Sequence, residues 1–434
     1  MIFCFGSFFL CSCGDDKKTT DLERQVEQLS AENSRLKSEI SDIKGTAGVA
    51  SGEGKIYKIA GSFAMTGPTS DMGIPYTKGV EDYVRYVNDE KLLGNDKIEC
   101  FLKDDGYQTE AAKRNFEEFI EQEIVLYLNY STGSTLALKN DFEEEKIAVI
   151  PASFHAGNIE GTNYVFLPIV SYSDQIIALG EYIEANHQGG TPKVALFIHP
   201  SAFGRGPVDV LQKAVEAGLK IEIVEVFEHG NDLDYTALLQ RLLSKKVQYV
   251  ICQTVQPPVS TLLNSAQGLG IIAGTYGEED KITFLGLHYA GGPDLIGLAG
   301  SAAENYYWTT SYKLTSMKGE GTTAQLDLAE RYGRDEKTAN SQSYTNGIQV
   351  VQIAVEAMRR VKTKGKDISR QTIHEELEAM NGFNAYYPLT TVGPVTYSKD
   401  DHQGVDFLQL YRVRDGVFQP VGAPFSSEYV EKIK

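Results

Sequence analysis

The chain has 434 residues, and its 41 basic and 59 acidic side chains give a net charge of −18. This length allows two lobes and a terminal extension, with the composition of an ordinary globular protein. An acidic surface argues against nucleic acid as a partner, because phosphate binding requires basic patches. No metal-ligand or nucleotide-binding spacing occurs, so we expect neither a metal nor a cofactor.

The first 13 residues, MIFCFGSFFLCSC, are apolar and too short to span a bilayer. They resemble the end of a secretory signal peptide, and residues 10–13 resemble a bacterial lipobox. Cys13 would then be the lipidated first residue of a lipoprotein anchored to the bilayer on the extracytoplasmic, periplasmic face of the cell envelope. The polar GDDKK that follows favours this interpretation over a cleaved signal without lipid. No Lys or Arg precedes the apolar run, which a truncated start would explain.

Residues 14–54 are predicted to form a tether with a helical heptad segment at 21–44. Its apolar positions alternate four and three apart, with Asn33 at a position that fixes register in coiled coils. About three heptads is near the minimum for stable pairing. The pattern therefore leaves open a coiled coil that pairs two copies of the chain and a lone helical spacer.

A strand, a loop and a helix are predicted over residues 56–88, with the helical spacing beginning after Pro75. In parallel α/β folds such a loop lies at the carboxyl end of the strand, where ligands bind. Ala-Met-Thr-Gly-Pro at 64–68, followed by Gly73 and Gly79, resembles the opening of the branched-chain amino-acid (leucine/isoleucine/valine) binding protein family. These are type I periplasmic substrate-binding proteins of ABC transporters. Later segments match in the same order to about residue 425.

The resemblance implies an α/β fold of two doubly wound, Rossmann-like lobes joined by a three-segment hinge, preceded here by the helical coiled-coil tail. Alternating predicted strands and helices agree with such lobes. We expect lobe 1 to comprise residues 55–170 and 310–390, and lobe 2 to comprise 171–309 and 391–434. Cys100 and Cys252 are expected to be buried free thiols in different lobes, with a disulfide between them as the alternative.

Two segments are expected to hold a carboxylate. Hydroxyl residues and a glycine open a predicted helix after the strand at 124–128, and free N–H groups at a helix start attract anions. The resemblance assigns the ligand carboxylate to this loop, here Ser131, Thr132 and Gly133; the alternative is simple N-capping. It places a second carboxylate-binding segment at Ser153, Phe154 and His155. The alternative for His155 is a solvated loop histidine.

The rest of the expected site comes from the same resemblance. Phe203 matches an aromatic residue that contacts the ligand in the family, and Met72 lies in the first ligand-binding loop. An acid that holds the α-ammonium in amino-acid binders is replaced here by His288 and Tyr289, with Gln256 in the preceding loop. The carboxylate half of the site is expected to be kept, and the ammonium half stays open. Asp294 is the nearest acid and is the alternative holder of the ammonium, although we expect it to cap a short helix at 295–298.

The resemblance implies an extracytoplasmic receptor of an ABC importer. It would bind a small carboxylate-bearing solute, an amino acid or a related organic or aromatic acid, by closing a cleft that a membrane permease then recognises. One alternative is a ligand-sensing domain of a signalling system. A hydrolase built on Ser153 and His155 is the least favoured, since no catalytic motif is present and no third residue can be named. We therefore predict no catalytic residue.

Overall fold

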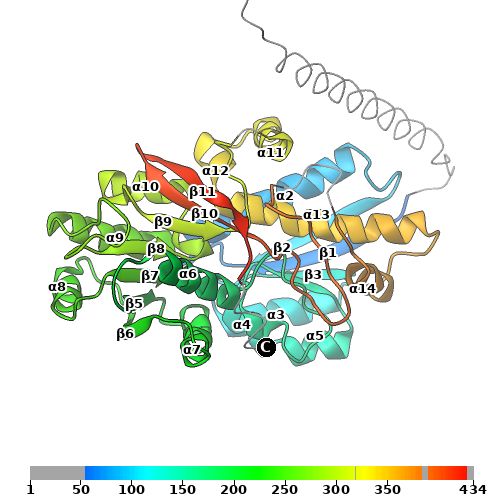
Figure 1. Cartoon of the computed structure of the whole chain (residues 1–434). Coiled ribbons are helices and arrows are strands. Elements are labelled where there is room, and N and C mark those ends of the chain that lie inside the picture. The colour runs from blue at the N-terminus through cyan, green and yellow to red at the C-terminus, as the bar shows by residue number, and fades with distance from the viewer. Residues whose placement is uncertain (1–53, 318, 384–389, 428–434) are drawn as a thin grey trace, which may run out of the picture. The chain divides into compact units, whose positions relative to one another are not determined.

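The computed structural model describes residues 54–317, 319–383 and 390–427 (Figure 1). The predictions for Cys13, for residues 1–13 and for the heptad segment at 21–44 lie outside these residues. Contacts divide the chain into residues 1–53 and a compact unit from Gly54 to Lys434. Within the described residues, no helix has both the length and the apolar character needed to cross a bilayer.

The described residues of the unit contain a four-stranded sheet in the order β2-β1-β3-β4, with all strands parallel. β1 (Ile56–Phe63), β2 (Lys97–Asp104), β3 (Leu126–Asn129) and β4 (Val149–Pro151) alternate with helices. These are α2 (Ser70–Asp89), α3 (Thr109–Ile120), α4 (Thr132–Ala137) and α5 (Lys139–Glu145). β3 and β4 are buried throughout, as expected where helices cover both faces of a parallel sheet.

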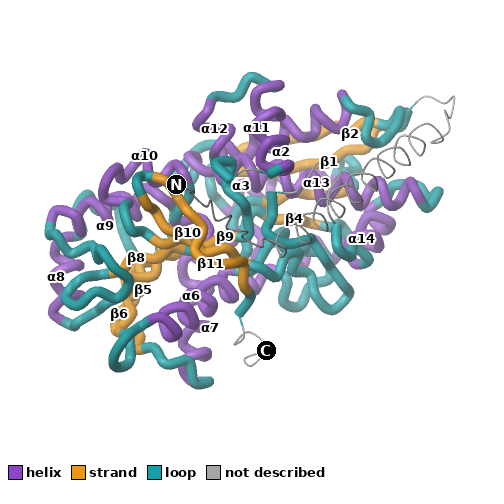
Figure 2. Tube along the Cα trace, turned by 45° about the horizontal axis from the view of Figure 1, so that its top comes forward, coloured by secondary structure: helices purple, strands orange, loops and turns teal. Residues whose placement is uncertain are grey.

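The second sheet has seven strands among the described residues, in the order β11-β10-β9-β8-β7-β5-β6. Five strands are parallel: β5 (Lys193–Ile198), β6 (Glu222–Glu228), β7 (Tyr249–Gln253), β8 (Thr283–Gly286) and β9 (Tyr307–Thr310). β10 (Leu408–Arg414) and β11 (Val417–Phe425) form an antiparallel hairpin beside β9 (Figure 2). The helices are α6 (Tyr172–Asn186), α7 (Ala202–Glu216), α8 (Thr236–Ser244), α9 (Gln256–Gly268) and α10 (Pro293–Ala299).

Among the described residues, four α-helices follow β9: α11 (Glu320–Arg331), α12 (Glu336–Asn340), α13 (Gln342–Thr363) and α14 (Arg370–Glu378). α13 packs against α2, and the two run side by side in Figure 1. A glycine from each helix makes the crossing possible. A Cβ at Gly79 would lie 2.3 Å from the Tyr344 carbonyl oxygen, and one at Gly347 would lie 2.1 Å from the Tyr76 carbonyl oxygen. Because glycine has no Cβ, the two backbones can approach this closely, and no larger residue fits at either position.

We call the four-stranded sheet with its helices the four-stranded lobe, and the other sheet with its helices the seven-stranded lobe. Across the described residues the chain passes between them three times: after β4, after β9 and before β10. These passages are hydrogen-bonded to one another. The Leu167 N–H donates to the His402 carbonyl at 2.8 Å, and the Val392 N–H donates to the Ser311 carbonyl at 2.8 Å. The mixed α/β class with parallel sheets is therefore confirmed.

Two helix starts differ from the sequence expectation. α2 begins at Ser70, before Pro75, because Gly73 lets the first turn lie against the backbone of Ala64, where a Cβ would be 1.9 Å from the carbonyl oxygen. α9 begins at Gln256, and prolines occupy its first turn, where no N–H is needed. Both helices therefore begin nearer to the strand that precedes them.

The two thiols fall on different sheets. Cys100 lies in β2 and Cys252 in β7, and both are free. This confirms that the two described thiols are free and lie in different lobes; Cys252 is buried as expected, whereas Cys100 is only partly buried.

Candidate ligand-binding site

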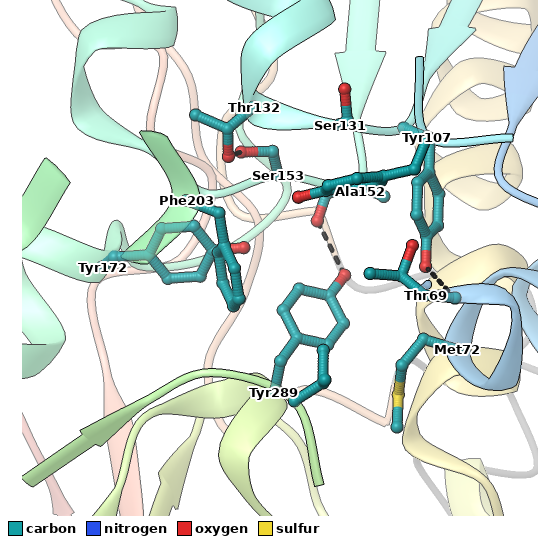
Figure 3. A pocket seen from close by; sticks show the side chains of 12 residues that line it. Thr69, Met72, Tyr107, Ser131, Thr132, Ala152, Ser153, Tyr172, Phe203 and Tyr289 are labelled. Carbon is teal, nitrogen blue, oxygen red and sulfur yellow. Dashed lines mark hydrogen bonds between the residues drawn. The ribbon is translucent and has the colours of Figure 1, made fainter. Parts of the chain in front are cut away.

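A pocket lies where strands of both sheets end. Tyr130 directly follows β3, and Ala152 directly follows β4; Tyr289 comes shortly after β8. Figure 3 shows Ala152 and Tyr289 converging with Phe203, which projects from α7. The pocket has a volume of about 30 Å³, counted as the space that the centre of a water molecule can occupy. The lining residues are Thr69, Met72, Tyr107, Tyr130, Ser131, Thr132, Ala152, Ser153, Tyr172, Phe203, Val255 and Tyr289.

One side of the pocket is made of hydroxyl groups. Ser131 is the N-cap of α4, and its Oγ accepts the Ser134 N–H at 3.1 Å. The hydroxyls of Thr132 and Ser153 lie 2.5 Å apart (Figure 3). Ser131 therefore caps the helix and also lines the pocket, so the two alternatives for this loop are compatible. Ser131 thereby occupies the Ser134 N–H, and the Thr132 and Gly133 N–H groups of the first helical turn, which have no partner within the helix, are available to an acceptor.

Thr69 adds a further hydroxyl that sequence reasoning did not identify. It precedes α2 and is only 3% exposed. Its Oγ1 has no hydrogen-bond partner among the described residues. A buried hydroxyl without a partner is costly, so this atom is available to a bound polar group.

The other walls are aromatic. The rings of Tyr172 and Phe203 lie 5.3 Å apart edge to face, and Tyr289 lies 6.0 Å from Phe203. Burial raises the pKa of Tyr107 to about 12 and raises the pKa values of Tyr289 and the other lining tyrosines further. All of these phenols are neutral at pH 7. Among the described residues that line the pocket, none carries a charge, so the chemistry offered is hydroxyl and N–H donors beside an apolar body.

Tyr289 closes the pocket between the two lobes. Its hydroxyl donates to the Ala152 carbonyl oxygen at 2.7 Å (Figure 3). The same hydroxyl accepts from Asn346 Nδ2 at 3.0 Å. Its ring stacks on Phe154, with centroids 5.7 Å apart. One side chain of the seven-stranded lobe thus contacts the four-stranded lobe by a hydrogen bond and by ring stacking.

His288 lies behind this wall rather than in the pocket. Its Nδ1 is 2.9 Å from Thr310 Oγ1, and Asn346 Nδ2 lies 3.1 Å from its Nε2. Burial lowers the pKa of His288 to about 3, so the ring is neutral at pH 7. Because the amide nitrogen Nδ2 of Asn346 can only donate, Nε2 of His288 accepts, and the proton is assigned to Nδ1, which donates to Thr310. His288 therefore positions Asn346 and Tyr289 and does not supply a charge to a ligand in the pocket.

His155 also lies outside the lining. Its Nδ1 accepts the Gly157 N–H at 3.0 Å, and its ring packs on Gly206 of α7, where a Cβ would be 2.0 Å from Nε2. Burial lowers its pKa, so the neutral ring carries its proton on Nε2. The Ser153 hydroxyl bonds to Thr132 and not to this ring. The pair is therefore not arranged as nucleophile and base.

The pocket gathers six of the predicted site residues: Met72, Ser131, Thr132, Ser153, Phe203 and Tyr289. Five others stand beside it: Gly133, Phe154, His155, Gln256 and His288. Six lining residues were missed, namely Thr69, Tyr107, Tyr130, Ala152, Tyr172 and Val255. Tyr130, Ala152 and Val255 directly or closely follow strand ends, a positional signal that was available. Tyr107 depends on a backbone φ of +64° after Gly106, which no pattern indicated.

Comparisons with known proteins agree with this geometry. The periplasmic binding protein family matches residues 56–417. The chain belongs to this family. A solved branched-chain amino acid ABC transporter protein from Thermus thermophilus, with bound valine, is 40% identical, with a TM-score of 0.82. That similarity covers 88% of this chain and 99% of the other.

Curated relatives are more distant. A leucine-specific-binding protein of Salmonella typhimurium is 23% identical over 83% of this chain and 90% of its own length. The leucine-, isoleucine-, valine-, threonine- and alanine-binding protein of Pseudomonas aeruginosa is 24% identical over 57% of this chain. The match spans 64% of that relative's length. A member of the periplasmic binding protein family is a solute receptor that works outside the cytoplasm, and its relatives are transporter proteins rather than enzymes.

The described residues contain no group of three or more His, Cys, Asp or Glu side chains suited to hold a metal ion.

Proposed function

We propose that this periplasmic binding protein is the receptor of an ABC importer for a small solute that carries a carboxylate. The relatives named above bind leucine, valine and similar amino acids, which are solutes of this kind. The observation that carries the proposal is the pocket at the strand ends of both sheets, closed by the Tyr289 hydrogen bond to Ala152. A ligand held there contacts both lobes and favours the closed form, which a permease then distinguishes from the open form.

The hydroxyl side of the pocket is the proposed carboxylate site. Ser131, Thr132 and Ser153 supply hydroxyls, and the start of α4 supplies N–H groups. A carboxylate oxygen accepts several such bonds at once, and water exclusion in the closed pocket strengthens each of them. The aromatic walls and Met72 suit an apolar or aromatic body on the same molecule.

A thermal-shift panel on the full-length protein tests this proposal. L-Leucine, L-valine and L-phenylalanine are compared with 4-methylpentanoate, 3-methylbutanoate and 3-phenylpropanoate, and with leucinamide. A ligand that binds only the folded state raises Tm by mass action. We expect at least one acid to raise Tm and leucinamide to have no effect, because leucinamide lacks the carboxylate.

Matched variants assign the effect to the pocket. Thr132→Val combined with Ser153→Ala removes two pocket hydroxyls and should abolish the ligand-induced shift. Ser244→Ala, an exposed serine on α8, should preserve it. The proposal fails if no carboxylate raises Tm, or if leucinamide stabilises the protein as strongly as leucine.

A further inference from the structure

A second, larger cavity adjoins the aromatic pocket. Its volume is about 310 Å³, ten times that of the pocket measured in the same way. Met72 lines both cavities. Val255 lines the pocket, and the next residue, Gln256, lines the larger cavity. We call this larger cavity the outer chamber. Met72 therefore lies between the two spaces, and its unbranched side chain can turn aside.

The outer chamber is built from both lobes. Residues of α2 and α12 line it from the four-stranded lobe, and residues of α9 and α10 line it from the seven-stranded lobe. Its charged lining residues are Asp71, Asp294 and Asp335 against Lys78 and Lys337. The outer chamber therefore has an acidic balance, in contrast to the uncharged pocket beside it.

Two carboxylates face the chamber from opposite lobes. Asp71 lies in the first turn of α2 and Asp294 in the first turn of α10. Burial raises the pKa of both carboxyl groups. The neighbouring Asp294 raises the pKa of Asp71 further, and Lys337 lowers the pKa of both. Asp294 does not cap α10, because the N-cap is Gly292 and receives no side-chain bond. Closure of the lobes brings these like charges together, which costs free energy unless a cation lies between them.

Among the described residues, an unpartnered acceptor of the protein, Gln256 Oε1, independently indicates that a ligand places a hydrogen-bond donor in the outer chamber. Gln256 is 2% exposed, and its Nε2 donates to the Gly291 carbonyl at 2.6 Å. Its Oε1 has no partner in the part of the chain that the structure describes. That bond fixes the orientation of the amide, so the unsatisfied atom is the acceptor. A buried acceptor without a partner, on the wall of an acidic cavity, suits an ammonium or guanidinium group.

We infer that the outer chamber binds a cationic group at the far end of an elongated ligand. An ammonium or guanidinium lies between Asp71 and Asp294 and donates to Gln256 Oε1, while the ligand carboxylate stays on the hydroxyl side of the pocket. This inference rests on the proposed function. The volume of the outer chamber, about 310 Å³, supports it, because this space has room for the part of a longer molecule that extends beyond the pocket.

Two pairs of probes differ only at the distal end. L-Lysine is compared with L-norleucine, and 6-aminohexanoate with hexanoate, by calorimetric titration of the full-length protein at pH 7. We expect each amine to bind about tenfold more tightly than its methyl-terminated partner. Asp71→Asn with Asp294→Asn should abolish this preference and leave norleucine and hexanoate binding within about twofold, a result that also shows that the variant is folded.

Two further variants act as controls. Lys337→Gln removes the cation that competes for Asp71 and Asp294, so the amines should bind more tightly. Glu110→Gln removes a first-turn acid of α3 that does not line the chamber, and the preference should remain. The inference is wrong if amines gain nothing over their partners, or if the double variant weakens norleucine as much as lysine. In both cases the proposed function stands, whereas it fails as well if none of the carboxylates binds.

Discussion

The Tyr289 hydroxyl donates a 2.7 Å hydrogen bond to the Ala152 carbonyl oxygen, and so links the end of β8 to the end of β4 across the pocket. This single bond joins the two lobes at the place where a ligand would join them. A residue with this role contributes to ligand affinity through the closed form, even where the ligand does not touch it.

Tyr289→Phe should therefore weaken ligand binding. The change leaves the buried Ala152 carbonyl without its partner in the closed form, at a cost of about 1–3 kcal/mol, so we expect affinity to fall about tenfold. Calorimetric titration with a ligand from the panel measures this. Tyr306→Phe is the matched control, because its hydroxyl donates at 2.8 Å to Ala290 within one lobe. It should lower stability and keep affinity; equal affinity losses in both variants would contradict the prediction.

Thr69→Val should make the ligand-free protein more stable and its ligand binding weaker. Valine has the shape of threonine and removes a buried hydroxyl that finds no acceptor or donor in the described residues. We expect about 1 kcal/mol of added stability in urea unfolding and about a tenfold loss of affinity. Thr345→Val provides the comparison, because its hydroxyl donates to Gln325 Oε1 at 3.0 Å outside the pocket. That variant should lose stability instead; a destabilised Thr69→Val protein would refute the assignment.

Arg334→Met should unfold the four-stranded lobe more easily. The guanidinium makes two hydrogen bonds to the Asp82 carboxylate, at 2.6 and 2.7 Å, and Asp82 is fully buried on α2. Removing one partner leaves a buried charge, so we expect a loss of about 3 kcal/mol in the free energy of unfolding, measured with urea. Lys366→Met, which breaks an exposed pair with Glu375, should change the unfolding midpoint little. Similar losses for both variants would show that burial of Asp82 does not matter.

The free energy of unfolding should decrease as pH is lowered from about 6.5 to about 4, in part because of His199. Burial, and then the neighbouring His229 and Arg205, lower the pKa of His199 from 6.5 to about 4. The unfolded chain therefore takes up this proton first as pH falls. The contribution of the neutral ring is fully present above pH 6.5 and is lost as pH falls towards 4.

His199→Gln should flatten the urea-unfolding profile in this window relative to the unchanged protein. The His199 ring also lies edge to face with the ring of Tyr107 in the pocket, with centroids 6.2 Å apart. Ligand affinity should therefore also decrease as pH is lowered through this window. Parallel profiles for the variant and the unchanged protein would assign the acid sensitivity to other groups.

Much of the fold could be predicted from the sequence because its signals are local. The apolar run at 124–128 predicted β3 within two residues, and the end of that strand indicated where Ser131 would line a pocket, whereas the family resemblance indicated Ser153. The start of α2 could not be predicted, because it depends on Gly73 lying against Ala64. The role of His288 also depends on distant partners, Thr310 and Asn346, which belong to other elements.

The two apolar residues on the rim of the outer chamber offer a practical use. Ile74 and Leu298 are 43% and 49% exposed, and they come from α2 and α10 on opposite lobes. Within the described residues the native thiols are Cys100 and Cys252, and burial raises the pKa of both, so they react slowly with maleimides at neutral pH. Cysteines introduced at positions 74 and 298 would accept a donor and an acceptor dye. Energy transfer between the dyes would then turn the receptor into an optical sensor for its own solute.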